Sequence, residues 1–253
     1  MVFLLILLTN DDGIRSEGLT NLRERLSTKH DVWVVAPERE RTCVGHAITL
    51  HKPLRMQEVG DRMYSSNGTP ADCILLAVNI VLPKKPDFVV SGINKGPNMG
   101  QDVNYSGTVA AAKQGAFLGI SSLAVSVCAR SGFHFADAAA CTEEVLYALR
   151  SKASRGSVFL NVNIPNAPYK SIKGFMVTRL GKRVYNDTVF ERTDPRGGKY
   201  YWIGGDGEGF EAIEGTDFHA VEQGFASITP LALDATSESS INILKKRLAR
   251  RSL

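Results

Sequence analysis

Apolar runs typical of buried strands alternate with helical segments over the first 165 residues of the chain. The expected strands are Val2–Leu8, Asp31–Ala36, Asp87–Ser91, Ser122–Val127 and Val158–Val162. The expected helices are Glu17–Leu26, Pro70–Val81, Gly107–Leu118 and Phe135–Leu149. This alternation predicts a three-layer, Rossmann-like α/β fold, in which helices cover both faces of a mainly parallel sheet. Two further segments, Ile48–Leu50 and Met63–Ser65, are expected to form a small inserted hairpin.

The second part of the chain has a different composition. Residues 166–209 are rich in Gly, Tyr, Arg and Asp, which predicts an appended β-hairpin arm. The further elements expected here are a β-like piece at Tyr200–Ile203, a returning core strand at Phe225–Pro230 and a terminal helix at Ser237–Arg251. We therefore predict a core at residues 1–165 and a region at 166–253 that serves in oligomerisation.

The bulk composition is that of an ordinary globular protein, with 43% hydrophobic and 22% charged residues among 253. The net charge of +4 is too small to predict a stable nucleic-acid partner. A basic tail at Lys245–Arg251 has two interpretations, a solvated helix face or a contact with a partner. The four cysteines lack the spacing of a zinc or redox motif, which favours the reducing cytoplasm. No apolar run is long enough to span a membrane.

Two adjacent acids, Asp11 and Asp12, follow the first expected strand. The carboxyl edge of a parallel sheet is where open α/β folds bind ligands. Neighbouring side chains of an extended strand point to opposite faces, so the pair can share one ligand only if the chain turns. Gly13 permits such a turn. The pair therefore indicates a site for a hard divalent metal, and the alternative is a helix cap or Asx-turn.

A glycine-rich segment, Ser91–Gly100, follows a later expected strand and leads to Ser106, Gly107 and Thr108 at the start of a helix. Exposed backbone N–H groups and a helix N-terminus both favour phosphate. Asn94 offers a neutral oxygen that would complete a carboxylate site. The alternative is an ordinary glycine-rich turn with a Ser or Thr cap.

Two other polar residues carry weaker signals. Thr42 could supply a hydroxyl ligand or cap a turn, and His46 could act as an acid or base or be structural. Neither side chain stands in a recognisable catalytic motif. The sequence alone therefore leaves the roles of Thr42 and His46 open.

Taken together, these segments resemble the SurE family, stationary-phase survival proteins that act as metal-dependent nucleotide phosphatases. The matching stretches are LLTNDDG at Leu7–Gly13, VVAPERERT at Val34–Thr42, NGTPADC at Asn67–Cys73 and VSGINKGPNMGQDVNYSGTVAAA at Val90–Ala112. The short stretches IPN at Ile164–Asn166 and SITPL at Ser227–Leu231 extend the resemblance to nearly the full length.

The resemblance implies a Mg²⁺ or Mn²⁺ ion held by Asp11, Asp12 and Asn94. Thr42 stands where the family usually places a serine ligand, and Cys43 stands where a glycine is frequent. The stretch that resembles a phosphate-binding region contains Asn98, Ser106, Gly107 and Thr108. A homodimer or homotetramer that exchanges C-terminal segments is implied as well.

We therefore expect a phosphomonoesterase that hydrolyses nucleoside 5′- and 3′-monophosphates, with short polyphosphate as a further candidate substrate. Asp11 and Asp12 are the expected catalytic residues, with the metal acting as a Lewis acid. A haloacid-dehalogenase-type phosphatase is a weaker alternative, because it needs acids one residue apart. A nucleotide-binding module without catalysis is a third, but it leaves the paired acids unexplained.

Overall fold

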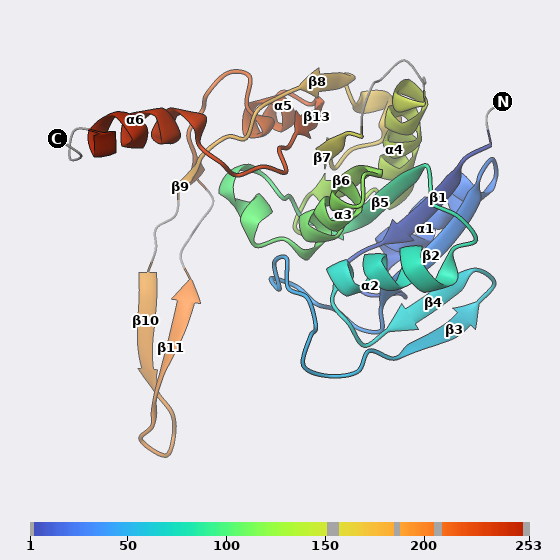
Figure 1. Cartoon of the computed structure of the whole chain (residues 1–253), viewed down its shortest axis with the longest axis horizontal. Helices are drawn as coiled ribbons and strands as arrows, with labels where there is room; N and C mark the ends of the chain where they lie inside the picture. Colours follow the sequence, from blue (N-terminus) through green and yellow to red (C-terminus); the bar gives the residue numbers. More distant parts are fainter. Residues whose placement is uncertain (1–2, 151–156, 185–187, 205–208, 250–253) are drawn as a thin grey trace.

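A computed structural model of the chain describes residues 3–150, 157–184, 188–204 and 209–249. In these ranges the main sheet has nine strands, in the order β3-β4-β2-β1-β5-β6-β7-β13-β8. Helices cover both of its faces (Figure 1), so the predicted three-layer, Rossmann-like α/β fold is confirmed. Val2 of the predicted first strand and Arg250 and Arg251 of the predicted terminal helix lie outside the described residues.

The main sheet is parallel through its centre, where β1 lies between β2 and β5, and β6 lies between β5 and β7. Only β3 with β4 and β7 with β13 pair antiparallel in this sheet, among the described strands. All five residues of β1 are buried, as expected for a central parallel strand. The strands are β1 (Leu5–Thr9), β2 (Asp31–Pro37), β3 (Met56–Gly60), β4 (Met63–Ser66), β5 (Phe88–Lys95), β6 (Ser121–Cys128), β7 (Phe159–Pro165), β8 (Phe175–Val177) and β13 (Ala226–Pro230).

The predicted inserted hairpin was right in its second strand and wrong in its first. β4 pairs with β3, Met56–Gly60, and not with Ile48–Leu50. Ile48 and Leu50 lie in an irregular segment and are 45% and 80% exposed. The tight connection through Asp61 and Arg62 joins β3 to β4, because a hairpin forms between strands that adjoin a short turn.

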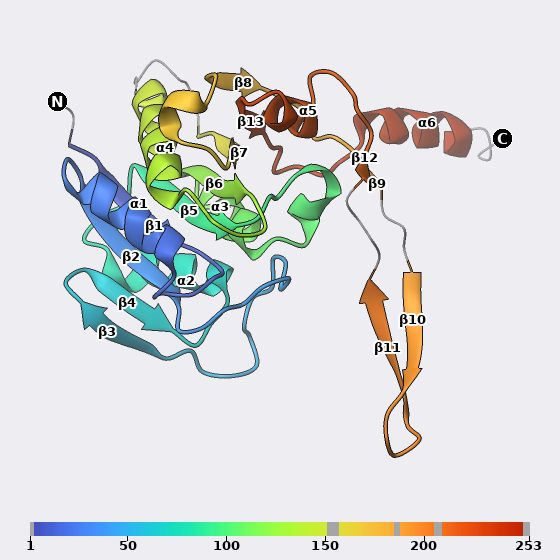
Figure 2. The same cartoon turned by 180° about the vertical axis from the view of Figure 1, so that it is seen from behind.

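Two pairs of helices enclose the sheet. α2 and α3 cover the face that is seen in Figure 1, and α1 and α4 cover the face that is seen in Figure 2. Ile6 and Leu8 pack in one core cluster and Leu7 in another, as the alternation of side chains along a strand requires. The helices are α1 (Glu17–Ser27), α2 (Pro70–Leu76), α3 (Gly107–Phe117), α4 (Phe135–Leu149), α5 (Asp217–Glu222) and α6 (Glu238–Ala249), with single turns η1 (Ala77–Val81), η2 (Gly100–Asn104) and η3 (Tyr169–Ser171).

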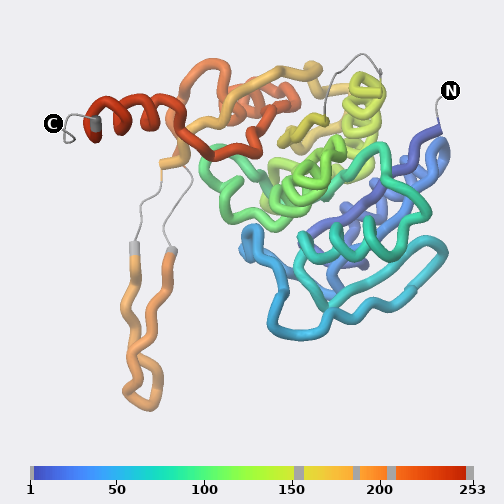
Figure 3. Tube along the Cα trace, viewed as in Figure 1, coloured from blue at the N-terminus to red at the C-terminus, as the bar shows by residue number. Residues whose placement is uncertain are grey.

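An arm of two antiparallel strands, β10 (Thr188–Thr193) and β11 (Lys199–Gly204), stands apart from the main sheet (Figure 3). The predicted strand at Tyr200–Ile203 is confirmed. The arm root is a short ladder of β9 (Arg183–Val184) with β12 (Gly209–Phe210). β8 and β13 follow residue 165 in the chain and return to the main sheet. The predicted boundary at residue 165 stays a prediction. No described helix has both the length and the apolar character needed to cross a membrane.

Candidate active site

The loops after the parallel strands enclose a cleft of about 830 Å³ at the carboxyl edge of the sheet. Most of the residues predicted for the site line it. They are Asp11, Asp12, Thr42, Asn94, Asn98 and Ser106. The remaining lining residues are Glu40, Cys43, Lys95, Gly96, Pro97, Asp102, Tyr105 and Ile203. Segments after β1, β2 and β5 thus converge, as the topology predicts.

The chain turns sharply after β1, but the acids do not make this turn. Asn10 closes it, accepting from the Gly13 N–H at 3.2 Å and donating to the Gly13 carbonyl at 3.0 Å. Gly13 has φ +99°, a conformation that favours glycine. Ser16 occupies the N-cap position of α1. The Asx-turn and cap alternatives for Asp11 and Asp12 are therefore wrong, and both carboxylates face the cleft.

Asp11 lies against the N-terminus of α3 and is only 5% exposed. The Thr108 hydroxyl donates to Asp11 Oδ1. A Cβ atom at Gly107 would lie 2.9 Å from Asp11 Oδ2, so only glycine allows this approach. The pKa of Asp11 is raised to about 6, because burial and, to a smaller extent, the neighbouring Asp12 carboxylate outweigh the hydrogen bond from Thr108. This carboxylate is therefore held where a cation would stabilise its charge.

Asp12 contacts the end of β5. Its Oδ2 accepts from the Lys95 backbone N–H at 3.3 Å. The pKa of Asp12 is raised overall. Burial raises it most, the Lys95 N–H and ammonium lower it, and the Glu40 carboxylate raises it. The register of β5 against β6 shifts between Ser91 and Asn94, which interrupts the strand just before the site.

Asn94 is placed where the sequence predicted a neutral ligand. Its amide nitrogen donates to the Gly96 carbonyl at 2.9 Å, so its Oδ1 atom is the end that can coordinate a cation. It lines the same cleft as both acids. Asp11, Asp12 and Asn94 therefore line one cleft, as a shared site requires, and the described residues contain no group of three Asp, Glu, His or Cys side chains that could hold a metal ion by themselves.

The segment after β2 contributes less directly. The Thr42 hydroxyl donates to the Glu40 carboxylate, so this hydroxyl is engaged by a neighbour in the cleft wall. Cys43 follows with φ 57°, a conformation that the glycine expected from the family would adopt without strain. His46 lies outside the cleft lining, where it hydrogen-bonds Gln114 and stacks on Phe117, so nothing in this geometry supports a catalytic role.

The predicted phosphate-binding residues divide into two groups. Ser106 caps α3 by accepting from the Val109 N–H at 3.1 Å and also lines the cleft. Asn98 lines it too, although its side-chain amide nitrogen donates to Ser126 at 2.9 Å. Gly107 and Thr108 are not part of the lining and lie behind Asp11. The helix cap thus coincides with one of the predicted phosphate-binding residues, Ser106.

A divalent cation fits this donor set. Asp11 and Asp12 are carboxylates, and neither forms an ion pair with a described lysine or arginine. Hard cations such as Mg²⁺ take oxygen ligands and are bound through one or two carboxylates together with water and substrate phosphate. Asp11, Asp12 and Asn94 are the residues that would hold it.

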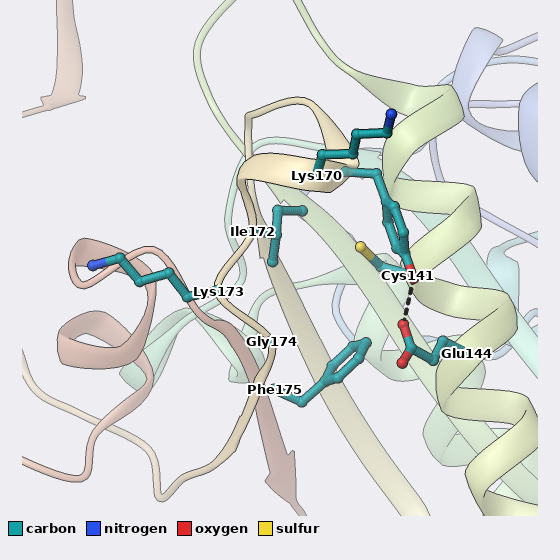
Figure 4. Close-up of a pocket in the computed structure, with 8 residues that line it drawn as sticks. Cys141, Glu144, Lys170, Ile172, Lys173, Gly174 and Phe175 are labelled. Carbon is teal, nitrogen blue, oxygen red and sulfur yellow. Dashed lines mark hydrogen bonds between the residues drawn. The ribbon is translucent and has the colours of Figure 1, made fainter.

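A second cavity of about 310 Å³ lies between α4 and the segment before β8 (Figure 4). Lys170 and Lys173 extend away from it, and Ile172 and Phe175 contribute apolar surface. Its carboxylate, Glu144, accepts from the Tyr169 hydroxyl at 2.7 Å. The paired acids and the capped helix terminus are absent from its lining, so the candidate site is the larger cleft.

Sequence reasoning missed several residues of the cleft. Glu40 and Lys95 lie in segments close to the ends of expected strands, and this position could have marked them as site residues. Ile203 reaches the cleft from the arm, far along the chain, and no local pattern marks it. Residues brought in by a distant element are visible only after folding.

Comparison with known proteins extends over nearly the full chain. Residues 6–187 match the family model described as "Survival protein SurE". A Geotalea daltonii protein named "5'-nucleotidase SurE" is 47% identical over 242 residues, 95% of this chain and 98% of that protein. A protein of the same name from Pseudoalteromonas atlantica is 42% identical over 245 residues, 97% and 99% of the two chains. The crystal structure of the SurE protein from Aquifex aeolicus aligns with a TM-score of 0.86 at 44% identity, covering 95% of this chain and 99% of that one.

Proposed function

Since the chain belongs to the SurE family, we propose that it is a divalent-metal-dependent 5′-nucleotidase that releases phosphate from nucleoside monophosphates. The proposal extends to nucleoside 3′-monophosphates and to short polyphosphate as further substrates. The observation that carries it is the position of Asp11 and Asp12 in the same cleft as the capped N-terminus of α3. The names of the similar proteins support the substrate class.

Each side of the cleft has its own part in the proposed reaction. The N-terminus of α3, an 11-residue helix capped by Ser106, would favour the negative charge of the phosphoryl group through its dipole. The Asn98 side chain would add a polar contact from the opposite loop. Thr108 orients Asp11 by donating to its carboxylate. These groups would position the phosphoryl centre for attack by water.

The charge of the cleft supports the metal requirement. Asp11, Asp12 and Glu40 line it together with Asp102, which is paired with Arg183, and Lys95 is the only cationic lining residue in the part of the chain that the structure describes. A phosphate dianion would be repelled by this excess of carboxylates. A bound divalent cation would reverse the local field and polarise the phosphoryl oxygens as a Lewis acid. Asp11 and Asp12 would hold that cation, and one of them would accept the proton of the attacking water.

Exposed apolar side chains on the arm support a proposed homodimer or homotetramer. Val189, Phe190 and Tyr201 are 60%, 42% and 57% exposed. On α6, Ile243 and Leu248 are 51% and 60% exposed. Large apolar side chains that are exposed in the single chain would be covered by contact with another chain. A second copy of the chain is the proposed partner, and the molar mass by light scattering after gel filtration tests it, since a monomer at micromolar concentration would reject it.

A cytoplasmic location is also proposed. The four cysteines are free in the structure, and burial raises the pKa of the Cys141 thiol to about 12, which makes it unreactive. Unpaired buried thiols are usual where the compartment is reducing. Fractionation of cells that express the full chain with a C-terminal epitope tests the location.

Phosphate release from AMP tests the function directly. We expect release with Mg²⁺ or Mn²⁺, loss in EDTA and recovery when metal is returned. Activity that is unchanged in chelator would reject the metal, and release from none of the nucleotides tested would reject the nucleotidase. Tight AMP binding without release, across several metals, would instead favour a binding module.

A substitution at the paired acids tests the assignment of residues. Asp11→Asn is expected to lower kcat at least about 100-fold, because it removes a charged group in contact with the reacting centre. It is also expected to weaken Mn²⁺ binding measured by calorimetry. Asp61→Asn is the matched control, since Asp61 is exposed in the β3–β4 turn. Equal activity of the Asp11→Asn variant and the control would remove Asp11 from the mechanism.

A further inference from the structure

The cleft is larger than the phosphoryl group requires. Its volume of about 830 Å³ falls in the range of about 300–1,000 Å³ that is typical of pockets for organic ligands. The proposed metal and phosphate residues, Asp11, Asp12, Asn94 and Ser106, are only part of its lining. The rest of the cleft therefore has room for the nucleoside that carries the phosphate.

Apolar residues also line the cleft. Tyr105 precedes the helix cap Ser106 and is 63% exposed, and Ile203 of β11 is 89% exposed. Pro97 adds to the same lining. Large exposed apolar side chains in a cleft that also contains acids are the expected form of a site that binds an amphiphilic ligand. A nucleotide is such a ligand, with a charged phosphate at one end and a flat base at the other.

The backbone holds Tyr105 firmly. Its N–H donates to the Asp102 carbonyl at 3.0 Å, and its carbonyl accepts from the Gly45 N–H at 3.1 Å. The Ser106 N–H also donates to the Asp102 carbonyl. These bonds fix the backbone of Tyr105 next to the cap residue Ser106.

The arm root contacts the η2 turn, which precedes Tyr105. Arg183 of β9 forms an ion pair with Asp102, with Nε 2.7 Å from Oδ2, and its N–H donates to Gln101 at 2.9 Å. The buried Asp217 carboxylate accepts from the N–H groups of Gly100 and Gly181, each at 2.8 Å. These contacts join the η2 turn to the root of the arm that contributes Ile203.

We propose that Tyr105 and Ile203 form the subsite for the nucleobase, with the ring of Tyr105 as its stacking surface. The inference rests on the proposed nucleotidase function, because it assigns the part of that site which distinguishes a nucleotide from a sugar phosphate. Every base has a π-face, so stacking on Tyr105 makes the enzyme selective for nucleotides without selecting one base. The arm thereby supplies a residue to substrate recognition.

Comparison of AMP with ribose 5-phosphate tests the subsite, since the two differ by the base alone. Tyr105→Ala is expected to raise KM for AMP about 5- to 150-fold, the range for loss of one base–aromatic stack. KM for ribose 5-phosphate should change less than about 2-fold. Tyr105→Phe should retain the wild-type values, because it keeps the ring. Ile203→Ala should raise KM for AMP about 2- to 5-fold. Its control is Trp202→Ala, because Trp202 is the neighbour of Ile203 on β11 and is outside the cleft lining.

Equilibrium binding provides a second measurement that does not need turnover. Calorimetry of AMP and ribose 5-phosphate with the wild-type chain should show tighter binding of AMP, and Tyr105→Ala should remove most of that difference. Equal affinity for the two compounds would overturn the subsite even in an active nucleotidase. So would a Tyr105→Ala variant that loses both substrates equally, or one that changes only the oligomeric mass. Failure of hydrolysis with preserved selectivity for AMP would reject the proposed reaction and support the subsite.

Discussion

β1 and β11 are both rich in apolar residues, yet the protein uses them in opposite ways. All five residues of β1 are buried, whereas Trp202 and Ile203 of β11 are 66% and 89% exposed. β1 has strands on both sides and helices over both faces, while β11 pairs only with β10 in the described part of the chain. Apolar composition therefore predicts that a strand will be covered, and the surroundings decide whether its own chain covers it.

The largest expected effect on stability comes from a cavity beneath the site. Leu8→Ala removes a fully buried side chain of β1 and is expected to lower the free energy of unfolding by about 2–5 kcal/mol. Urea unfolding followed by circular dichroism measures it. Trp202→Ala on the arm is the matched control and should change that free energy by less than about 0.5 kcal/mol in the monomer. A loss at Trp202 as large as that at Leu8 would contradict the contrast between the two strands.

A buried ion pair in the core should come second. Glu143 of α4 is 5% exposed in its side chain and accepts from Arg25 Nε at 2.7 Å and Lys29 Nζ at 2.8 Å. Glu143→Gln is expected to cost about 1–2 kcal/mol near neutral pH, a value reduced because both cations are partly exposed. Urea unfolding near pH 7 measures it, and no change would show that the carboxylate charge is not needed there.

The same variant has a predicted pH dependence. Burial raises the pKa of Glu143, but the bonds and charges of Lys29 and Arg25 outweigh it and hold the pKa below its ordinary value. A lowered native pKa means that the contribution is complete above the unfolded pKa of about 4.3 and is lost as the pH falls through the native value. The stability gap between wild type and Glu143→Gln should therefore close in acid. A gap that widened on acidification would contradict this sign.

An ion pair on the arm should have the smallest effect. Lys199 Nζ lies 2.8 Å from Glu191 Oε1, and the side chains are 63% and 49% exposed. Lys199→Gln is expected to change the free energy of unfolding by less than about 0.5 kcal/mol, since exposed pairs gain little in water. Thermal unfolding at low and high salt measures it. A loss equal to that of Glu143→Gln would indicate that the arm pair is buried by a partner.

Local patterns predicted much of the fold and part of the site. The order of strands and helices and the start of a helix after Ser106 could be predicted, because each depends on residues that adjoin in sequence. The inserted hairpin was misplaced, because apolar content at Ile48–Leu50 says nothing about which neighbour closes the shorter turn. The boundary at residue 165 stays a prediction.

Asp11 and Asp12 illustrate what the sequence predicts and what only the tertiary structure determines. Their place after a buried strand was readable from the sequence, since an apolar run that stops at two acids must end at a polar edge. Their surroundings were not readable: the contact of Thr108 with Asp11, the Lys95 N–H at Asp12 and the reach of Ile203 into the cleft. These contacts join residues that are remote in the chain, and they exist only because the packed sheet brings the ends of its strands and the arm root together.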